Sequence, residues 1–107
     1  MTTRAANRNE VDLDLIEAQN ISRLFSALND ESRVRIVYLL MQEERIFVSE
    51  IAERTGQHIS SVSHHLRILK DLGFVRHERE GKHVYHMLDD ECIRDIMERA
   101  KEHVAGK

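Results

Sequence analysis

Residues 48–73 contain two short helical patterns separated by a glycine turn, and this spacing restricts the fold more than any other feature of the chain. The segment reads VSEIAERTGQHISSVSHHLRILKDLG. Ser49 is predicted to cap the first helix, and Gly56 to end it in the left-handed conformation that glycine tolerates. The second helix is predicted to begin at Ser60 or the residue before it and to end at Gly73. Two helices joined by a turn of about three to four residues that contains glycine form a helix-turn-helix.

The second helix of this pair has an apolar side and a polar side. Side chains repeat at about 100° per residue in a helix, so residues three and four apart share a side. The side predicted to enter the core consists of Ile59, Val62, Leu66 and Leu69. The outward side consists of Ser60, His64, Arg67 and Asp71, with Ser61 and Ser63 on its flanks. His65 lies near the core side and is predicted to pack or hydrogen-bond internally.

The outward side carries residue types that suit contact with duplex DNA. Serines are short and polar, so they let a helix backbone come close to phosphates and base edges, and Arg67 can reach guanine or phosphate in the major groove. Gln57, in the turn, can contact adenine or the DNA backbone. The predicted DNA-contacting residues of this region are Gln57, Ser60, Ser61, Ser63, His64 and Arg67. The alternative is an ordinary amphipathic helix with a polar surface.

A basic β-hairpin is predicted directly after the helix pair, over residues 74–88. Its two arms, FVRHERE and KHVYHML, contain alternating or β-favouring residues and flank Glu80 and Gly81. The cations near its tip are Arg76, Arg79 and Lys82, with His83 beside them. A basic hairpin in this place can lie along the DNA backbone or enter the minor groove, and Arg79 and Lys82 are the predicted contacts.

The rest of the chain is predicted to be helical. Apolar periodicity indicates a helix over residues 11–28, and the following LNDES provides Asn29 or Asp30 as the cap of a helix that ends near residues 41–43. A last amphipathic helix is predicted over about residues 90–104. The fold class is therefore mainly α with a β-hairpin wing, in the order α-α-α-α-β-β-α. Residues 1–10 are predicted to form a flexible arm, and residues 11–104 one DNA-binding and dimerisation domain.

Charge and composition restrict the class of protein. The 107 residues have a net charge of −3, but residues 57–83 contain five Lys or Arg against three acids, so the positive charge is concentrated there. The single cysteine excludes a disulfide within one chain. No apolar run approaches the roughly 18 residues that span a bilayer, so we expect a cytoplasmic protein with no membrane partner. We do not expect an enzyme, because no nucleophile–base pair, phosphate loop or cofactor motif is present.

The chain resembles the ArsR/SmtB family of bacterial winged-helix repressors. The resemblance is carried by FSALNDESRVRIVYLL at 25–40, the segment 48–75, REGKHVYHML at 79–88 and DDECI at 89–93. Glu31 is a departure, because the family commonly has proline there. The resemblance implies a homodimer, joined by the first and last helices, that binds an imperfect palindrome in double-stranded DNA and is released by an effector, often a metal ion. Twofold symmetry also fits one short recognition helix per chain.

The resemblance also implies a metal site on the last helix. The family pattern falls on Asp90, Cys92, His103 and Gly106, so one position has Cys in place of His and the fourth ligand is lost. Cys92 and His103 would lie about 16 Å apart along one helix at 1.5 Å per residue, so one ion would have to bind Asp90 and Cys92 of one chain and His103 of an antiparallel partner. This donor set favours Zn(II), or Ni(II) or Co(II), with Glu102 or water as a fourth ligand.

Simpler interpretations of these residues remain open. Asp90 can cap the helix, Cys92 can pack on a buried face, and His103 can be a surface residue near a helix end. The protein would then be the same repressor without metal control, answering to a thiol-reactive or other signal, or a winged-helix protein-interaction module. Cadmium, lead and arsenite sensing are discounted because IFVSE contains no cysteine. His77 and His86 are predicted to be surface histidines that face each other across the hairpin.

Overall fold

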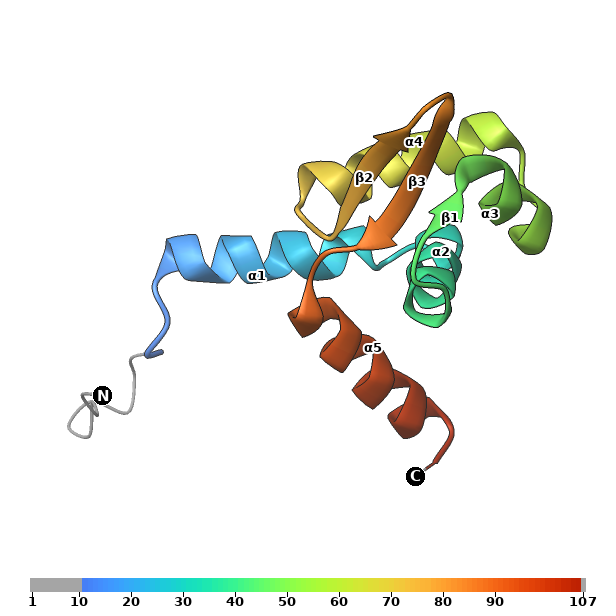
Figure 1. The fold of residues 1–107 in the computed structure, drawn as a ribbon. Coiled ribbons are helices and arrows are strands. Elements are labelled where there is room, and N and C mark those ends of the chain that lie inside the picture. Colours follow the sequence, from blue (N-terminus) through green and yellow to red (C-terminus); the bar gives the residue numbers. More distant parts are fainter. Residues whose placement is uncertain (1–10, 107) are drawn as a thin grey trace.

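The computed structural model describes residues 11–106 and contains five helices and a small antiparallel sheet (Figure 1). In chain order the elements are α1 (Leu15–Ala27), α2 (Glu31–Gln42), β1 (Ile46–Phe47), α3 (Val48–Thr55), α4 (Ile59–Asp71), β2 (Val75–Glu80), β3 (His83–Leu88) and α5 (Glu91–Val104). The predicted arm at residues 1–10 lies outside the described residues. The winged helix-turn-helix is confirmed, with α3 and α4 as the helix pair and β2–β3 as the wing. No helix in the described range is long and apolar enough to cross a membrane.

The sequence analysis missed one strand. β1 is only two residues long and pairs with the edge of β3 that β2 leaves free, so the sheet order is β1-β3-β2. A two-residue strand has no alternation that a sequence pattern could reveal. Its pairing with residues almost forty positions later, Ile46 with His86, fixes the wing against the start of α3. The wing itself closes through a two-residue loop in which Gly81 has a positive φ of 64°.

Local side-chain caps set the helix boundaries. Asp14 accepts a hydrogen bond from the backbone N–H of Glu17, and the Glu17 carboxylate accepts one in return from the N–H of Asp14, so α1 starts at Leu15 and not at residue 11 as predicted. Asp30 accepts a hydrogen bond from the backbone N–H of Arg33, which confirms it as a cap of α2. This hydrogen bond also lowers the pKa of Asp30.

The start of α3 differs from the prediction. Phe47, not Ser49, is the N-terminal cap residue, because the chain passes from β1 directly into the helix. The exposed backbone N–H of Phe47 is satisfied by the carboxylate of Glu50 at 3.3 Å. Gly56 ends α3 with φ of 68°, as predicted, and α4 begins at Ile59.

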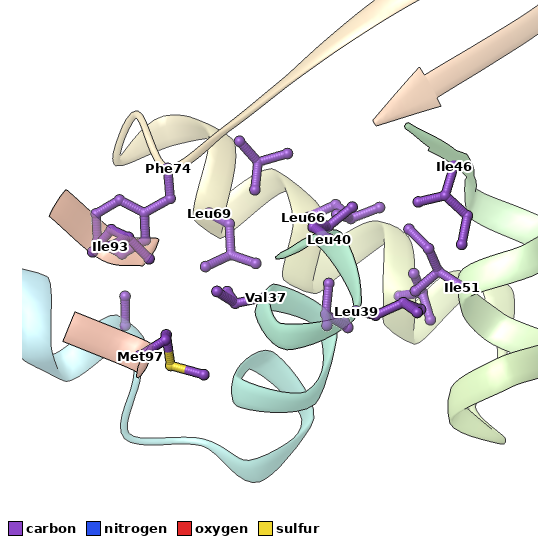
Figure 2. Packing of buried hydrophobic residues seen from close by; sticks show 14 of the residues in the cluster. Val37, Leu39, Leu40, Ile46, Ile51, Leu66, Leu69, Phe74, Ile93 and Met97 are labelled. Carbon is purple, nitrogen blue, oxygen red and sulfur yellow. The ribbon is translucent and has the colours of Figure 1, made fainter. Parts of the chain in front are cut away.

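The core lies where α2, α3, α4 and the sheet meet, and α5 adds to one end (Figure 2). Its fully buried side chains are Ile36, Val37, Leu40, Ile46, Ile51, Val62, Leu69 and Ile93. Phe74 and Met97 lie with Ile93 at the α5 end of this cluster. Burial of the apolar side chains on the inner face of α4 against α2, α3 and the sheet therefore holds the helix pair in place.

Helices α1 and α5 extend from this body (Figure 1). Large apolar side chains on them, and in the segment before α1, are exposed. The exposed large apolar residues of this surface are Val11, Leu13, Leu15, Ile16, Ile21, Phe25 and Val104. A groove of about 810 Å³ between α1, α2 and α5 is lined by apolar side chains that include Phe25, Ile96 and Val104. Contiguous exposed apolar surface of this kind is typical of a protein–protein contact.

Candidate nucleic-acid interface

The outward face of α4 presents the predicted set of polar side chains to solvent. Those that are exposed are Ser60, Ser61, Ser63, His64 and Arg67. Val62, Leu66 and Leu69 on the opposite side are buried, which confirms the orientation of the helix. Gln57, in the turn before α4, is half-buried, and its Oε1 is buried without a hydrogen-bond partner among the described residues.

Ile59 is a correction to the predicted core face. It is 52% exposed although its angular position matches that of Val62 and Leu66. Ile59 is the first residue of α4, and burial begins one turn later, at Val62. An apolar side chain therefore stands beside the exposed serines at the leading end of the helix.

His65 is tied to the body of the protein, as predicted. Its Nδ1 lies 3.3 Å from Nη1 of Arg33, and the Nε–H of Arg33 donates to the carbonyl oxygen of Ala27 at 2.6 Å. Arg33 thus connects the end of α1 with α4. His64, the neighbouring histidine, is exposed, so the two histidines have the separate environments that the helical spacing predicts.

The wing has two different faces. Because side chains alternate along a strand, the cross-strand pairs His77–His86 and Arg79–Val84 share one face, and Glu78–Tyr85 and Glu80–His83 share the other. The first face is the one toward α4, since His86 lines a cavity with α4 residues. Arg79 therefore lies on the face of the wing that adjoins the recognition helix.

Ion pairs within the chain neutralise the acids of the wing. Arg45 donates to both carboxylate oxygens of Glu80 at 3.1 Å, and its guanidinium also stacks over the ring of Tyr85 at 3.8 Å. Arg76 donates to Glu78 at 2.6 Å and lies 3.2 Å from Asp89. Both acids of the wing are paired on the face away from α4.

The basic side chains of α4 and of the outer end of the wing have no ion-pair partner among the described residues. Between residues 11 and 106, no carboxylate forms an ion pair with Arg67, Lys70, Arg79 or Lys82. Four basic side chains without internal partners, beside a row of exposed serines, form a surface suited to a polyanion. A count of charged residues over 57–83 gives only a small excess of positive charge. The count cannot show that acids of this segment are neutralised by basic residues elsewhere in the chain.

Two residues of this surface were not among the predicted contacts. Lys70 and His86 line a cavity of about 390 Å³ between α4 and the sheet, together with Ser63 and Arg67. Ser63, Arg67 and Lys70 are spaced i, i+4, i+7, so the helical pattern could have revealed Lys70. His86 could not have been found from sequence, because its position under α4 depends on strand register.

His86 is half-buried rather than a surface histidine as predicted. It does face His77 across the hairpin, with ring centroids 6.0 Å apart. Burial lowers the pKa of His86 below 6.5, and the neighbouring His77 and Lys70 lower it further. Its Nδ1 is buried and has no hydrogen-bond partner in the part of the chain that the structure describes.

The three predicted metal ligands lie at opposite ends of α5. Oδ1 of Asp90 accepts hydrogen bonds from the backbone N–H of Cys92 at 2.8 Å and of Ile93 at 3.3 Å, so Asp90 caps the helix. Cys92 is exposed, which contradicts the alternative that it packs on a buried face. His103 is exposed in the last turn. Among residues 11–106 of one chain, no three His, Cys, Asp or Glu side chains lie close enough together to hold a metal ion. The length of α5 keeps Asp90 and Cys92 apart from His103.

Comparison with known proteins places the chain in a family. Residues 30–77, which contain α2, the helix pair and the start of the wing, match the family model described as "Bacterial regulatory protein, arsR family". A cadmium resistance transcriptional regulatory protein, the CadC homolog of Staphylococcus aureus, is 38% identical over 94 residues, covering 88% of this chain and 78% of that protein. The transcriptional repressor SmtB homolog of Synechocystis is 34% identical over 92 residues, covering 86% and 69%.

Solved structures agree with the fold. The antimony-specific transcriptional repressor AntR superposes with a TM-score of 0.81 at 21% identity, covering 98% of this chain and 95% of that one. A homodimeric winged helix-turn-helix DNA-binding domain from Mycobacterium bovis superposes with a TM-score of 0.77 at 25% identity, covering 92% and 91%. These relatives are regulators, in agreement with the expectation that the chain is not an enzyme. On the level of identity and coverage, the chain belongs to the ArsR/SmtB family of winged helix-turn-helix transcriptional regulators.

Proposed function

We propose that the protein is a homodimeric repressor that binds a palindromic site in double-stranded DNA. The observation that carries this proposal is that four cations of α4 and the wing form no ion pair with any described residue: Arg67, Lys70, Arg79 and Lys82. In the proposed complex α4 enters the major groove, with Ser60, Ser61, Ser63, His64 and Arg67 as its contacts and Gln57 beside them. Arg79 and Lys82 hold the backbone from the wing.

A second copy of the chain is the proposed cover of the apolar surface on α1 and α5. The exposed side chains there, including Ile21 and Phe25 of α1 and Val104 of α5, would be buried in a dimer. The homodimeric M. bovis structure has the same fold, which supports this arrangement. A dimer would present two α4 helices, and the half-sites of a palindrome about one helical turn apart would bind both.

For the effector, we propose a transition metal ion, with Zn(II), Ni(II) and Co(II) as candidates. The residues fit such an ion: the Asp90 cap uses only Oδ1, so Oδ2 remains available, and Cys92, two residues further along the chain, is exposed. His103 of the partner subunit would complete the set from an antiparallel α5. These thiolate, imidazole and carboxylate donors suit a borderline-soft ion.

A metal ion bound between the two protomers would change their relative orientation and, through it, the affinity for DNA. Asp90 and Cys92 of one protomer, joined to His103 of the other, would fix the angle between the two α5 helices. Each α5 packs through Ile93 and Met97 on the same core as α4, so the spacing of the recognition helices would change with it. A coupling of about 1–3 kcal/mol is enough for derepression.

The relatives' names include a cadmium regulator, but cadmium stays discounted for this chain. It has one cysteine, so a site with several thiolates cannot form within one protomer. A cytoplasmic location is part of the proposal, since the DNA of a bacterial cell lies there.

The test is a fluorescence-anisotropy titration of the protein on its own promoter fragment, repeated with zinc, nickel and cobalt. We expect tight binding without metal and weaker binding with at least one ion, and we expect Cys92→Ser to remove the metal effect while leaving DNA binding intact. Unchanged DNA affinity at saturating metal would favour the second candidate, a repressor that answers to a thiol-reactive signal at the exposed Cys92. Absence of DNA binding at low salt would favour a protein-interaction module.

A further inference from the structure

A cavity between α4 and the wing brings basic side chains of the recognition helix together with a histidine of the sheet. It has a volume of about 390 Å³ and lies between one flank of the recognition helix and the inner face of β3. Ser63, Arg67 and Lys70 come to it from α4, and His86 comes from β3. Val48 and the buried Leu66 also line it, so the cavity lies between the edge of the apolar core and the serine-lined face of α4.

The side chains of Ser63, Arg67 and Lys70 around this cavity have no partners among residues 11–106. Arg67 and Lys70 make no ion pair with any residue from 11 to 106. The hydroxyl of Ser63 is exposed and has no hydrogen bond to another described side chain. Unpaired donors grouped around one space leave room for an acceptor that the chain does not supply.

His86 adds a donor that only the tertiary structure reveals. Its Nδ1 is buried without a hydrogen-bond partner among the described residues, and burial lowers the pKa of the ring. The other ring nitrogen, Nε2, is the one that would donate to a ligand in the cavity.

We propose that this cavity seats one backbone phosphate of the bound duplex, held by Lys70 and Arg67 with hydrogen bonds from Ser63 and His86. The proposal rests on the proposed DNA-binding function and adds Lys70 and His86 to its contacts. A phosphate seated between helix and wing would fix the register of α4 in the groove, because phosphate contacts orient a protein on DNA without reading sequence.

One carboxylate opposes this site. Asp71, the last residue of α4, also lines the cavity and has no ion pair with another described residue. The titratable groups that line the cavity are Arg67, Lys70 and Asp71 from α4 and His86 from β3, and His77 pairs with His86 on the neighbouring strand. From α3 only Val48 lines it, and no residue of β1 does. The balance is positive, and removal of the Asp71 charge is expected to increase it further.

The experiment measures binding of full-length protein to a duplex of unrelated sequence as a function of salt. Lys70→Gln is compared with Arg99→Gln, which removes the same charge from an unpaired side chain on α5. A lost phosphate contact reduces the slope of log K against log salt by about one and weakens binding by about three- to tenfold at low salt. We expect both effects for Lys70→Gln and neither for Arg99→Gln, and we expect Asp71→Asn to strengthen binding.

Each other outcome overturns the proposal. Equal changes in slope for Lys70→Gln and Arg99→Gln would mean that only net charge matters. Weaker binding by Asp71→Asn would place the phosphate elsewhere. If the wild-type protein does not bind the duplex at low salt, both the proposed function and the phosphate site are wrong. If the wild type binds but Lys70→Gln behaves like Arg99→Gln, only the phosphate site is wrong. Lys70→Gln could also abolish saturable binding of inorganic phosphate while leaving the salt dependence of duplex binding unchanged. The cavity would then bind a free anion and not a DNA phosphate.

A second measurement reports on His86 directly. In an NMR titration of the imidazole resonances, a phosphate in the cavity favours the charged ring, so the pKa of His86 rises when saturating duplex is added. The His103 ring, at the far end of α5, serves as the control. A pKa of His86 that falls or does not move on saturation with duplex would overturn the assignment.

Discussion

Arg33 joins the end of α1 to the recognition helix, with its Nη1 3.3 Å from Nδ1 of His65 and its Nε–H bonded to the carbonyl oxygen of Ala27. Through these two contacts Arg33 links α1, part of the proposed dimer surface, to the DNA-reading helix. Both contacts are partly buried, so their removal leaves polar groups without partners.

We expect Arg33→Met to lower the free energy of unfolding by about 1–3 kcal/mol, because the carbonyl of Ala27 and the ring of His65 lose their donor. The measurement is urea denaturation at one fixed protomer concentration, since stability of a dimer depends on concentration. Arg99→Met, on the surface of α5, is the control and should stay within about 0.5 kcal/mol of wild type. Equal losses for the two variants would contradict the connecting role.

Ile59 and Leu69 both belong to the predicted apolar side of α4 but have opposite environments, at 52% and 0% exposure. Leu69→Ala should lower the free energy of unfolding by about 2–5 kcal/mol, because it leaves a cavity in the core. Ile59→Ala should change it by less than about 0.5 kcal/mol. Denaturation of both variants tests the corrected core face, and a large loss for Ile59→Ala would restore the original prediction.

His86 gives the fold a pH dependence whose sign follows from the direction of its pKa. Because the folded-state pKa lies below 6.5, the unfolded chain binds this proton first as the pH falls, and folded protein loses stability from about pH 6.5 down through the folded pKa. We expect the wild type to be less stable at pH 5.5 than at pH 7.5, and His86→Phe to lose part of this difference.

The control for that comparison is His83→Phe, which alters an exposed histidine of the same strand. It should leave the difference between the two pH values unchanged. Asp30 does not affect this comparison, because it titrates at lower pH. Its pKa is lowered below 3.8, so its stabilising effect is lost only when the pH falls below that value. An identical pH dependence for wild type and His86→Phe would show that His86 does not titrate in this way.

Arg79 and Arg76 are a matched pair on one strand of the wing. Arg79 lies on the face toward α4 and is unpaired, whereas Arg76 is held by Glu78 and Asp89 on the other face. We expect Arg79→Ala to weaken binding to any duplex and to reduce the salt slope by about one. Arg76→Ala should have a smaller effect on both, as measured by fluorescence anisotropy over a range of salt. A larger effect of Arg76→Ala would reverse the assignment of the two faces.

Much of the fold could be predicted because its signals are local. Asp30 as the cap of α2, Gly56 as the end of α3 and the two-residue turn at Gly81 each depend on residues within four positions of one another. The outward set from Ser60 to Arg67 follows from the same kind of regularity, the fixed rotation of a helix. The resemblance to the family rests on these segments too.

What the sequence by itself determined is therefore the order and type of the main elements, the helix pair with its wing, and which side of α4 carries serines and arginine. The tertiary structure alone decided that β1 pairs with β3, that Ile59 stands in solvent, and that His86 lies in a cavity under α4. It also decided which cations are free, since Arg45 pairs with Glu80 at a separation of 35 residues. Periodicity and capping act within one or two helical turns, whereas burial, ion pairing and strand register depend on which distant segments meet in space.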